Sequence, residues 1–170
     1  MKKIMEMLQN MKAKNEKKDN KGFSLVELII VIAIMAILVG IVGTQVLPYI
    51  NKSKEAKDFQ IINSYGTAAT TAYSSNAEKV QTNITFKVYA PGSDTTAVTL
   101  SDEIKELTGY DTIEALAGSA SKTGKMASKK GKTIAEIQVS IDLTNKKITT
   151  QAYSDAACST KVFDAIVTEL

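Results

Sequence analysis

The fold of this 170-residue chain is decided by the stretch Gly22-Phe23-Ser24-Leu25-Val26-Glu27-Leu28-Ile29-Ile30-Val31-Ile32-Ala33-Ile34-Met35-Ala36-Ile37-Leu38. A basic leader ends at the glycine, and a single glutamate stands four residues after the phenylalanine. An uninterrupted apolar run begins directly after that glutamate. This order predicts a cleavage site on the charged side of a membrane segment, so that cleavage would leave the membrane anchor on the mature protein.

The apolar run is long enough to cross a membrane. Residues 28 to 42 carry no polar side chain, and the next charge after Glu27 is Lys52. A spanning helix needs about 20 residues, which the run reaches if residues 43 to 50 contribute. Each Leu, Ile or Val favours insertion by roughly 0.3 to 0.6 kcal/mol, and together they outweigh a glutamate at the end of the span, which costs less than about 3 kcal/mol.

Charge is distributed unevenly along the chain. Residues 1 to 22 hold seven lysines and three acids, whereas residues 23 to 170 hold fourteen lysines and fifteen acids. Because the leader lysines precede the span, the positive-inside rule predicts a cytoplasmic N terminus and an external position for residues after about 50. The leader is compatible with an amphipathic helix on the inner leaflet or with a disordered basic tail, and Met1 or Met11 could be the start.

Residues 22 to 28, together with the apolar run, resemble the N terminus of type IV pilins and their pseudopilin relatives. The resemblance covers roughly residues 21 to 60. It implies that a prepilin peptidase cuts after Gly22 and N-methylates Phe23. It also implies that Glu27 governs subunit addition at the filament base by pairing with the freed amine of a neighbouring Phe23.

These implied roles have a physical basis. Gly22 has no side chain, so an extended backbone can enter a peptidase cleft at the membrane surface. Glu27 lies about 6 Å, or one helical turn, beyond the new amine. In a filament core of low dielectric constant an unpaired Glu27 would be costly, whereas a paired one would be strongly oriented. Taken alone, Glu27 also fits a boundary acid whose carboxylate reaches the headgroups.

The position of the first proline departs from the family pattern. Many family members carry a proline about twenty residues into the mature chain, where this chain has Gly40, Gly43 and Thr44 and a later Pro48. Each glycine lowers helix stability by about 1 kcal/mol, and a proline removes a backbone hydrogen bond. We therefore expect any loosening of the helix to lie between Gly40 and Pro48.

The residues after Asn51 predict an amphipathic continuation of the same helix to about Ser75. Apolar and small residues recur at spacings of three and four, which defines one helical stripe. We expect this stripe to pack on a sheet rather than to form a coiled coil. The stripe comprises Phe59, Ile62, Gly66, Ala69 and Tyr73.

The remaining residues predict short strands and helices. Alternating apolar residues indicate strands over 84–89, 134–143 and 148–153, and the tail 161–170 is a candidate last strand. Ser101 is expected to cap a short helix that stops near Gly109, and a second short helix is expected over 112–117. Residues 118 to 132, rich in Ser, Gly and Lys, are expected to form an exposed loop.

The predicted fold class is α+β, with one long helix packed on a small antiparallel sheet. Three parts are expected along the chain: a cleaved leader (1–22), a hydrophobic helix for membrane and filament core (23–50) and an extracellular head (51–170) that includes the outer half of the long helix.

Composition argues against an enzyme. The chain has no histidine, which is the usual acid–base group near neutral pH, and no arginine, which is the best bidentate reader of phosphate. The sequence contains no phosphate loop, no cysteine–histidine metal spacing and no nucleophile–base set. No cofactor or metal site is therefore predicted, and Cys158, the sole cysteine, cannot form an intramolecular disulfide.

Lysines cluster in the predicted loop and form a candidate anion-binding patch. A solvated loop is the simplest interpretation. Nucleic acid and teichoic-type polymers are alternative ligands, although no aromatic residue lies between these lysines to stack on bases. The patch comprises Lys122, Lys125, Lys129, Lys130 and Lys132.

The patterns together predict a structural subunit of a type IV pilus that serves adhesion, motility or biofilm formation. The expected partners are copies of the same chain, prepilin peptidase, the inner-membrane assembly machinery and, before assembly, membrane lipid. A single-pass form in the cytoplasmic membrane would precede an extracellular filament. A minor pilin, a secretion-type pseudopilin and a DNA-uptake competence pilin remain alternatives.

Overall fold

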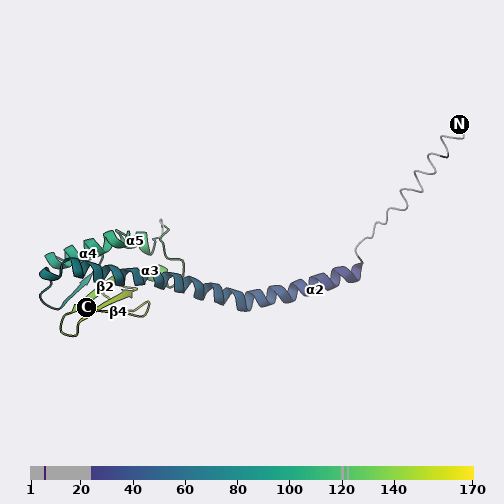
Figure 1. Cartoon of the computed structure of the whole chain (residues 1–170). Coiled ribbons are helices and arrows are strands. Elements are labelled where there is room, and N and C mark those ends of the chain that lie inside the picture. The colour runs from purple at the N-terminus through teal and green to yellow at the C-terminus, as the bar shows by residue number, and fades with distance from the viewer. Residues whose placement is uncertain (1–5, 7–23, 120, 122) are drawn as a thin grey trace. The chain divides into compact units, whose positions relative to one another are not determined.

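The computed structural model describes Glu6 and residues 24–119, 121 and 123–170. An uninterrupted helical segment confirms the predicted long helix (Figure 1). Its three parts are α2 (Leu25–Ile41), the π-helix η1 (Val42–Val46) and α3 (Leu47–Ser75). By contact density the chain divides into two compact units, Met1–Leu47 and Pro48–Leu170.

The apolar part of the long helix has no packing partner among the described residues. Every residue from Ser24 to Lys54 is exposed. The segment Leu25–Ser75 contains a stretch long and apolar enough to cross a membrane. A helix suits such a role because it satisfies its backbone hydrogen bonds internally, without water.

The head contains one four-stranded antiparallel sheet with the order β1-β2-β3-β4. Its register pairs Ile137 with Ala152 and Ile141 with Ile148, so that alternate residues share one buried face. The predicted strands are therefore present, and the candidate last strand forms at the sheet edge. The strands are β1 (Ile84–Lys87), β2 (Glu136–Asp142), β3 (Lys147–Tyr153) and β4 (Ile166–Glu169).

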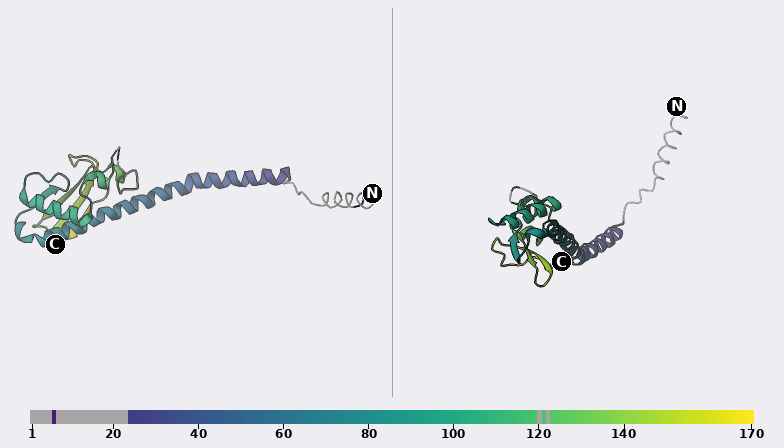
Figure 2. Two further views of the ribbon diagram at one scale, coloured as in Figure 1. Left: turned by 90° about the horizontal axis from the view of Figure 1, so that it is seen from above. Right: turned by 60° about the vertical axis from the view of Figure 1, so that its left-hand side comes forward.

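Helices cover the buried face of the sheet. Figures 1 and 2 show α3, α4 (Thr95–Thr108) and α5 (Ile113–Leu116) gathered on one side of the strands. The predicted stripe of α3 faces this core, where Ile62, Gly66 and Ala69 are buried. A Cβ atom added at Gly66 would lie 2.7 Å from Ile166 Cγ2, so the glycine allows α3 to approach β4 closely.

The described residues also form two short 3₁₀-helices. They are η2 (Ala77–Lys79), directly after the long helix, and η3 (Gly131–Thr133), directly before β2.

The expected cap of the first head helix was wrong. Helix α4 begins at Thr95, and the Asp94 carboxylate caps it by accepting hydrogen bonds from the backbone N–H groups of Thr96 and Ala97. Ser101 lies within α4 and is buried. The helix begins earlier than expected because Ala97 and Leu100, which precede Ser101, also pack into the core. Gly109, with φ 75°, ends the helix as expected.

Candidate functional site

Glu27 lies in the first turn of α2 and is exposed. Its carboxylate accepts a hydrogen bond from the Ser24 backbone N–H at 2.9 Å. This contact satisfies one of the unpaired N–H groups at the helix N terminus, where the helix dipole also favours a negative charge. Gly22 and Phe23 lie outside the described residues, so cleavage and methylation at these positions stay predictions.

The helix departs from α geometry between Gly40 and Pro48. The Leu47 N–H donates to the Val42 carbonyl five residues earlier, and Thr44 Oγ1 donates to the Gly40 carbonyl at 3.0 Å. Pro48 has no N–H to offer the Thr44 carbonyl, which favours a local change of hydrogen-bonding pattern. Loosening of this segment, with roles for Gly40, Gly43 and Pro48, stays a prediction.

A buried carboxylate fixes the lysine-rich loop to the long helix. Asp58 of α3 is 1% exposed, and it accepts hydrogen bonds from the N–H groups of Ala127 and Ser128, each at 2.8 Å, and from the Ser128 hydroxyl. A Cβ atom at Gly131 would lie 2.3 Å from Asp58 Oδ2, so only glycine fits there. Hydrogen bonds are required because an unpaired buried charge is costly. We call this set of contacts the Asp58 clamp.

The loop is therefore only partly exposed, which corrects the expectation for residues 118 to 132. Met126 and Ser128 are buried, because the Asp58 clamp draws this part of the loop against α3. The Met126 N–H also donates to the Leu116 carbonyl at 3.0 Å, which ties the loop to α5. These contacts thus anchor the loop backbone next to Lys125, Lys129 and Lys130.

The described lysines of the candidate patch are exposed, and Lys122 lies outside the described residues. The Lys130 ammonium group lies 4.8 Å from the centroid of the Phe163 ring, a cation–π geometry. Phe163 in turn packs against Phe59 of α3 with centroids 6.0 Å apart. The exposed lysines of the loop are Lys125, Lys129, Lys130 and Lys132.

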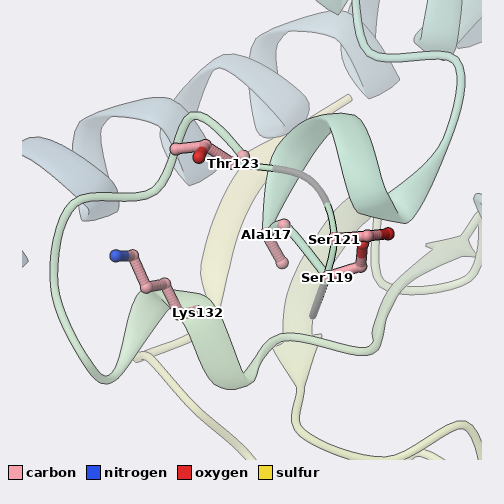
Figure 3. Close-up of a pocket in the computed structure, with 7 residues that line it drawn as sticks. Ala117, Ser119, Ser121, Thr123 and Lys132 are labelled. Carbon is pink, nitrogen blue, oxygen red and sulfur yellow. The ribbon is translucent and has the colours of Figure 1, made fainter.

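A hollow of about 520 Å³ lies beside the loop and is lined by Ala117, Gly118, Ser119, Ser121, Thr123, Gly124 and Lys132. Figure 3 shows Ser119 and Ser121 on the opposite side of Ala117 from Lys132. Among the labelled residues, the serine hydroxyl groups do not converge on the lysine amine.

The core contains a tyrosine cluster that the sequence does not predict. The hydroxyl groups of Tyr65 and Tyr89 are 2.5 Å apart, and Tyr110 stacks on Tyr65 with ring centroids 6.4 Å apart. The Tyr89 N–H donates to Glu136 Oε1 at 3.0 Å. Burial raises the pKa of Tyr65 to about 12, and it also raises the pKa values of Tyr89 and Glu136. Both phenols thus stay protonated near neutral pH and serve the core as hydrogen-bonding groups.

A family model for the prokaryotic N-terminal methylation motif matches residues 17–43. The chain carries the type IV prepilin leader signature. The matched residues include the end of the charged leader, residues 22–28 and the whole apolar run 28–42, and the match confirms the resemblance seen in the sequence. No curated protein and no solved structure shows a significant match to the chain. The prepilin signature therefore assigns the N-terminal segment, and the head must be interpreted from its own residues.

Asp58 could have been found from the sequence. It precedes Ile62 by four residues and Tyr65 by seven, which places it on the buried face of the helix. The tyrosine cluster joins α3, the loop after α4 and residues at the ends of β1 and β2, so no local pattern could have revealed it.

Proposed function

We propose that this chain is the precursor of a type IV pilus subunit. Prepilin peptidase would cut after Gly22 and methylate Phe23, and the mature chain would polymerise into a surface filament. The long helix would form the filament core and the heads would form its outer surface. Adhesion, motility and biofilm formation are the uses that such a filament would serve.

One observation carries the proposal: a prepilin signature leads into an apolar helix that no part of the described chain covers. Large exposed apolar surfaces are rare on soluble proteins and indicate contact with lipid or with another protein. Before assembly, lipid would surround α2 as a single membrane pass with the N terminus inside. After assembly, the same face would contact the α2 helices of neighbouring subunits.

Glu27 would set the register of assembly. Its contact with the Ser24 N–H satisfies the carboxylate within one subunit and leaves the exposed residue accessible to a partner. The methylated amine of Phe23 in a neighbouring subunit would supply a positive charge. A subunit inserted out of register would leave both charges unpaired in surroundings of low dielectric constant, which is strongly unfavourable.

The test compares Glu27→Ala with Glu114→Ala in cells that carry prepilin peptidase and the pilus assembly machinery. Glu114 is an exposed acid of the head, so its loss controls for a change in net charge. We expect normal processing of both variants. Filament recovery should fall more than about tenfold for Glu27→Ala alone, because breaking a buried ion pair costs about 3–5 kcal/mol. Wild-type filament abundance from Glu27→Ala would remove Glu27 from this role.

A second candidate function is a minor pilin or a secretion-type pseudopilin, because the same N-terminal signature would serve it equally well. Abundance and filament length separate these functions. An abundant subunit in long sheared filaments supports the major pilin, whereas a trace subunit in short assemblies supports the alternative.

The exposed loop lysines make a DNA-uptake pilin a third candidate, which DNA-binding measurements at increasing salt concentration would test. DNA binding through lysine–phosphate contacts would weaken steeply with salt, because such contacts release counterions.

A further inference from the structure

The lysines of the mature chain are concentrated in two segments. Residues 51–57 and 118–133 together contain eight lysines and one acid, whereas the rest of residues 23–170 contains six lysines and fourteen acids. A mature chain that is nearly neutral as a whole therefore has one strongly basic part and one strongly acidic remainder.

The first basic segment follows the predicted membrane exit directly. Lys52, Lys54 and Lys57 are exposed on α3, and Lys52 comes two residues after Ile50, where the predicted span ends. At 1.5 Å per residue, Lys57 lies only about 10 Å beyond Ile50 along the helix axis. These lysines lie on the predicted outer side of the span, so the positive-inside rule, which concerns cytoplasmic lysines, does not explain their position.

The second basic segment is held at the same level of α3. The Asp58 clamp attaches Ala127 and Ser128 to the helix one residue beyond Lys57, and Lys129 and Lys130 follow directly in the chain. The clamp residue Asp58 is buried, and both of its carboxylate oxygens accept hydrogen bonds from the loop. Folding thus brings two lysine-containing segments, about 70 residues apart in sequence, to the same level of α3.

From this arrangement we infer that the base of the head binds the anionic phospholipid surface of the membrane before assembly. The juxtamembrane basic surface consists of Lys52, Lys54 and Lys57 on α3, and of Lys125, Lys129, Lys130 and Lys132 on the loop. The inference rests on the membrane anchoring and the external head of the proposed function. The ligand is the phosphate layer of a bilayer that contains anionic lipid.

Chain connectivity favours a bilayer over other polyanions. The membrane-spanning helix delivers the basic surface to the headgroup layer, within about one Debye length at physiological salt. Lysine is suited to diffuse attraction of this kind, since its ammonium is a compact point charge without the fixed geometry of arginine. Lys132 borders the hollow of Figure 3, where the hydroxyl groups do not converge on it, so a broad surface interaction is favoured over one bound phosphate.

The contact would orient the head before polymerisation. An attracted basic surface keeps the base of the head at the headgroups and directs the acidic remainder away from them. Extraction of a subunit into the filament would break this contact, so anionic lipid would stabilise the unassembled pool of subunits.

The test uses the full chain in nanodiscs, at one chain per disc, made of phosphatidylcholine alone or with about 30% phosphatidylglycerol. Acetylation of each lysine by an amine-reactive reagent is followed by mass spectrometry. Anionic lipid should slow acetylation of Lys54, Lys129 and Lys132 at least about threefold, through shielding and through local stabilisation of the charged amine. About 0.5 M NaCl should restore the rates.

Three exposed lysines elsewhere in the head are internal controls. Lys79 follows the long helix, Lys146 lies in the turn between β2 and β3, and Lys147 is the first residue of β3. Their acetylation rates should be the same in both lipids. Uniform slowing of all lysines, or equal rates at the base in both lipids, would overturn the inference. If slowing occurs only with two chains per disc, the surface binds a second copy of the chain. If free phosphate slows acetylation in phosphatidylcholine discs, the surface binds a soluble anion.

An Asp58→Asn variant tests the role of the loop attachment. Anionic lipid should then protect Lys129 and Lys132 less while still protecting Lys54, whereas Asp102→Asn, an exposed control on α4, should leave all three unchanged. No filament is needed for this assay. A failed lipid effect therefore leaves the proposed polymerisation intact, and a failure to polymerise in cells leaves the lipid effect intact.

Discussion

Replacement of Asp58 tests the structural link between the long helix and the lysine loop. The carboxylate accepts three hydrogen bonds from Ala127 and Ser128 in a buried position. Hydrogen bonds to charged groups each contribute about 1.5–3 kcal/mol. Asparagine keeps one acceptor oxygen and turns an NH₂ group toward a backbone donor. We therefore expect Asp58→Asn to lower the free energy of loop opening by about 2–3 kcal/mol, less than the full sum because the opened loop regains water.

Amide hydrogen exchange of the full chain in detergent micelles measures this opening directly. A loss of 2–3 kcal/mol corresponds to roughly 30- to 150-fold faster exchange of the 125–131 backbone. Asp102→Asn is the matched control, because the exposed Asp102 forms a salt bridge with Lys105 at 2.8 Å, and surface pairs contribute about 1 kcal/mol or less. Exchange that changes less than about twofold in Asp58→Asn, or equally in both variants, would refute the reasoning.

Three further predictions concern the head. Gly66→Ala should speed amide exchange in β4 because the new methyl group would displace Ile166, and Ile166→Ala in the same chain should restore slow exchange. The raised pKa of Tyr65, about 12, means that the folded chain keeps a proton that the unfolded chain loses near pH 10. Stability to urea should therefore be complete below pH 10 and fall between pH 10 and about 12, and Tyr65→Phe should reduce that fall; an equal fall in both proteins would contradict the assignment. Cys158 has φ 58°, a left-handed conformation that glycine adopts easily and valine does not. Cys158→Gly should therefore keep or raise the urea midpoint of unfolding, and Cys158→Val should lower it. The opposite order would exclude backbone strain at this turn.

The sequence predicted the elements whose signals are local. The order of Gly22, Phe23 and Glu27 before an apolar run indicated the prepilin signature without any knowledge of the head. Alternation at Ile137, Val139 and Ile141 gave the central strand, because one buried face imposes a period of two. The stripe on α3 could be predicted because one buried face of a helix imposes spacings of three and four residues.

The sequence did not predict features that depend on several distant segments. Both Asp94 and Ser101 are residue types that commonly cap helices. Asp94 is the cap because the helical turn that follows it packs into the core through Ala97. Asp58 resembled a solvated charge until the loop backbone supplied its donors. The composition of the loop predicted that it would be exposed. This is correct for its described lysines, but the contacts with Asp58 bury Ser128.

The central claim is that the N-terminal helix survives maturation and becomes the core of a polymer. Mass analysis of the N-terminal peptide from filaments sheared off the cell surface tests it most directly. We predict a chain that begins at Phe23, carries one additional methyl group and retains residues 28–42. A sheared protein that retains the leader, or one that lacks residues 28–42, would contradict the account.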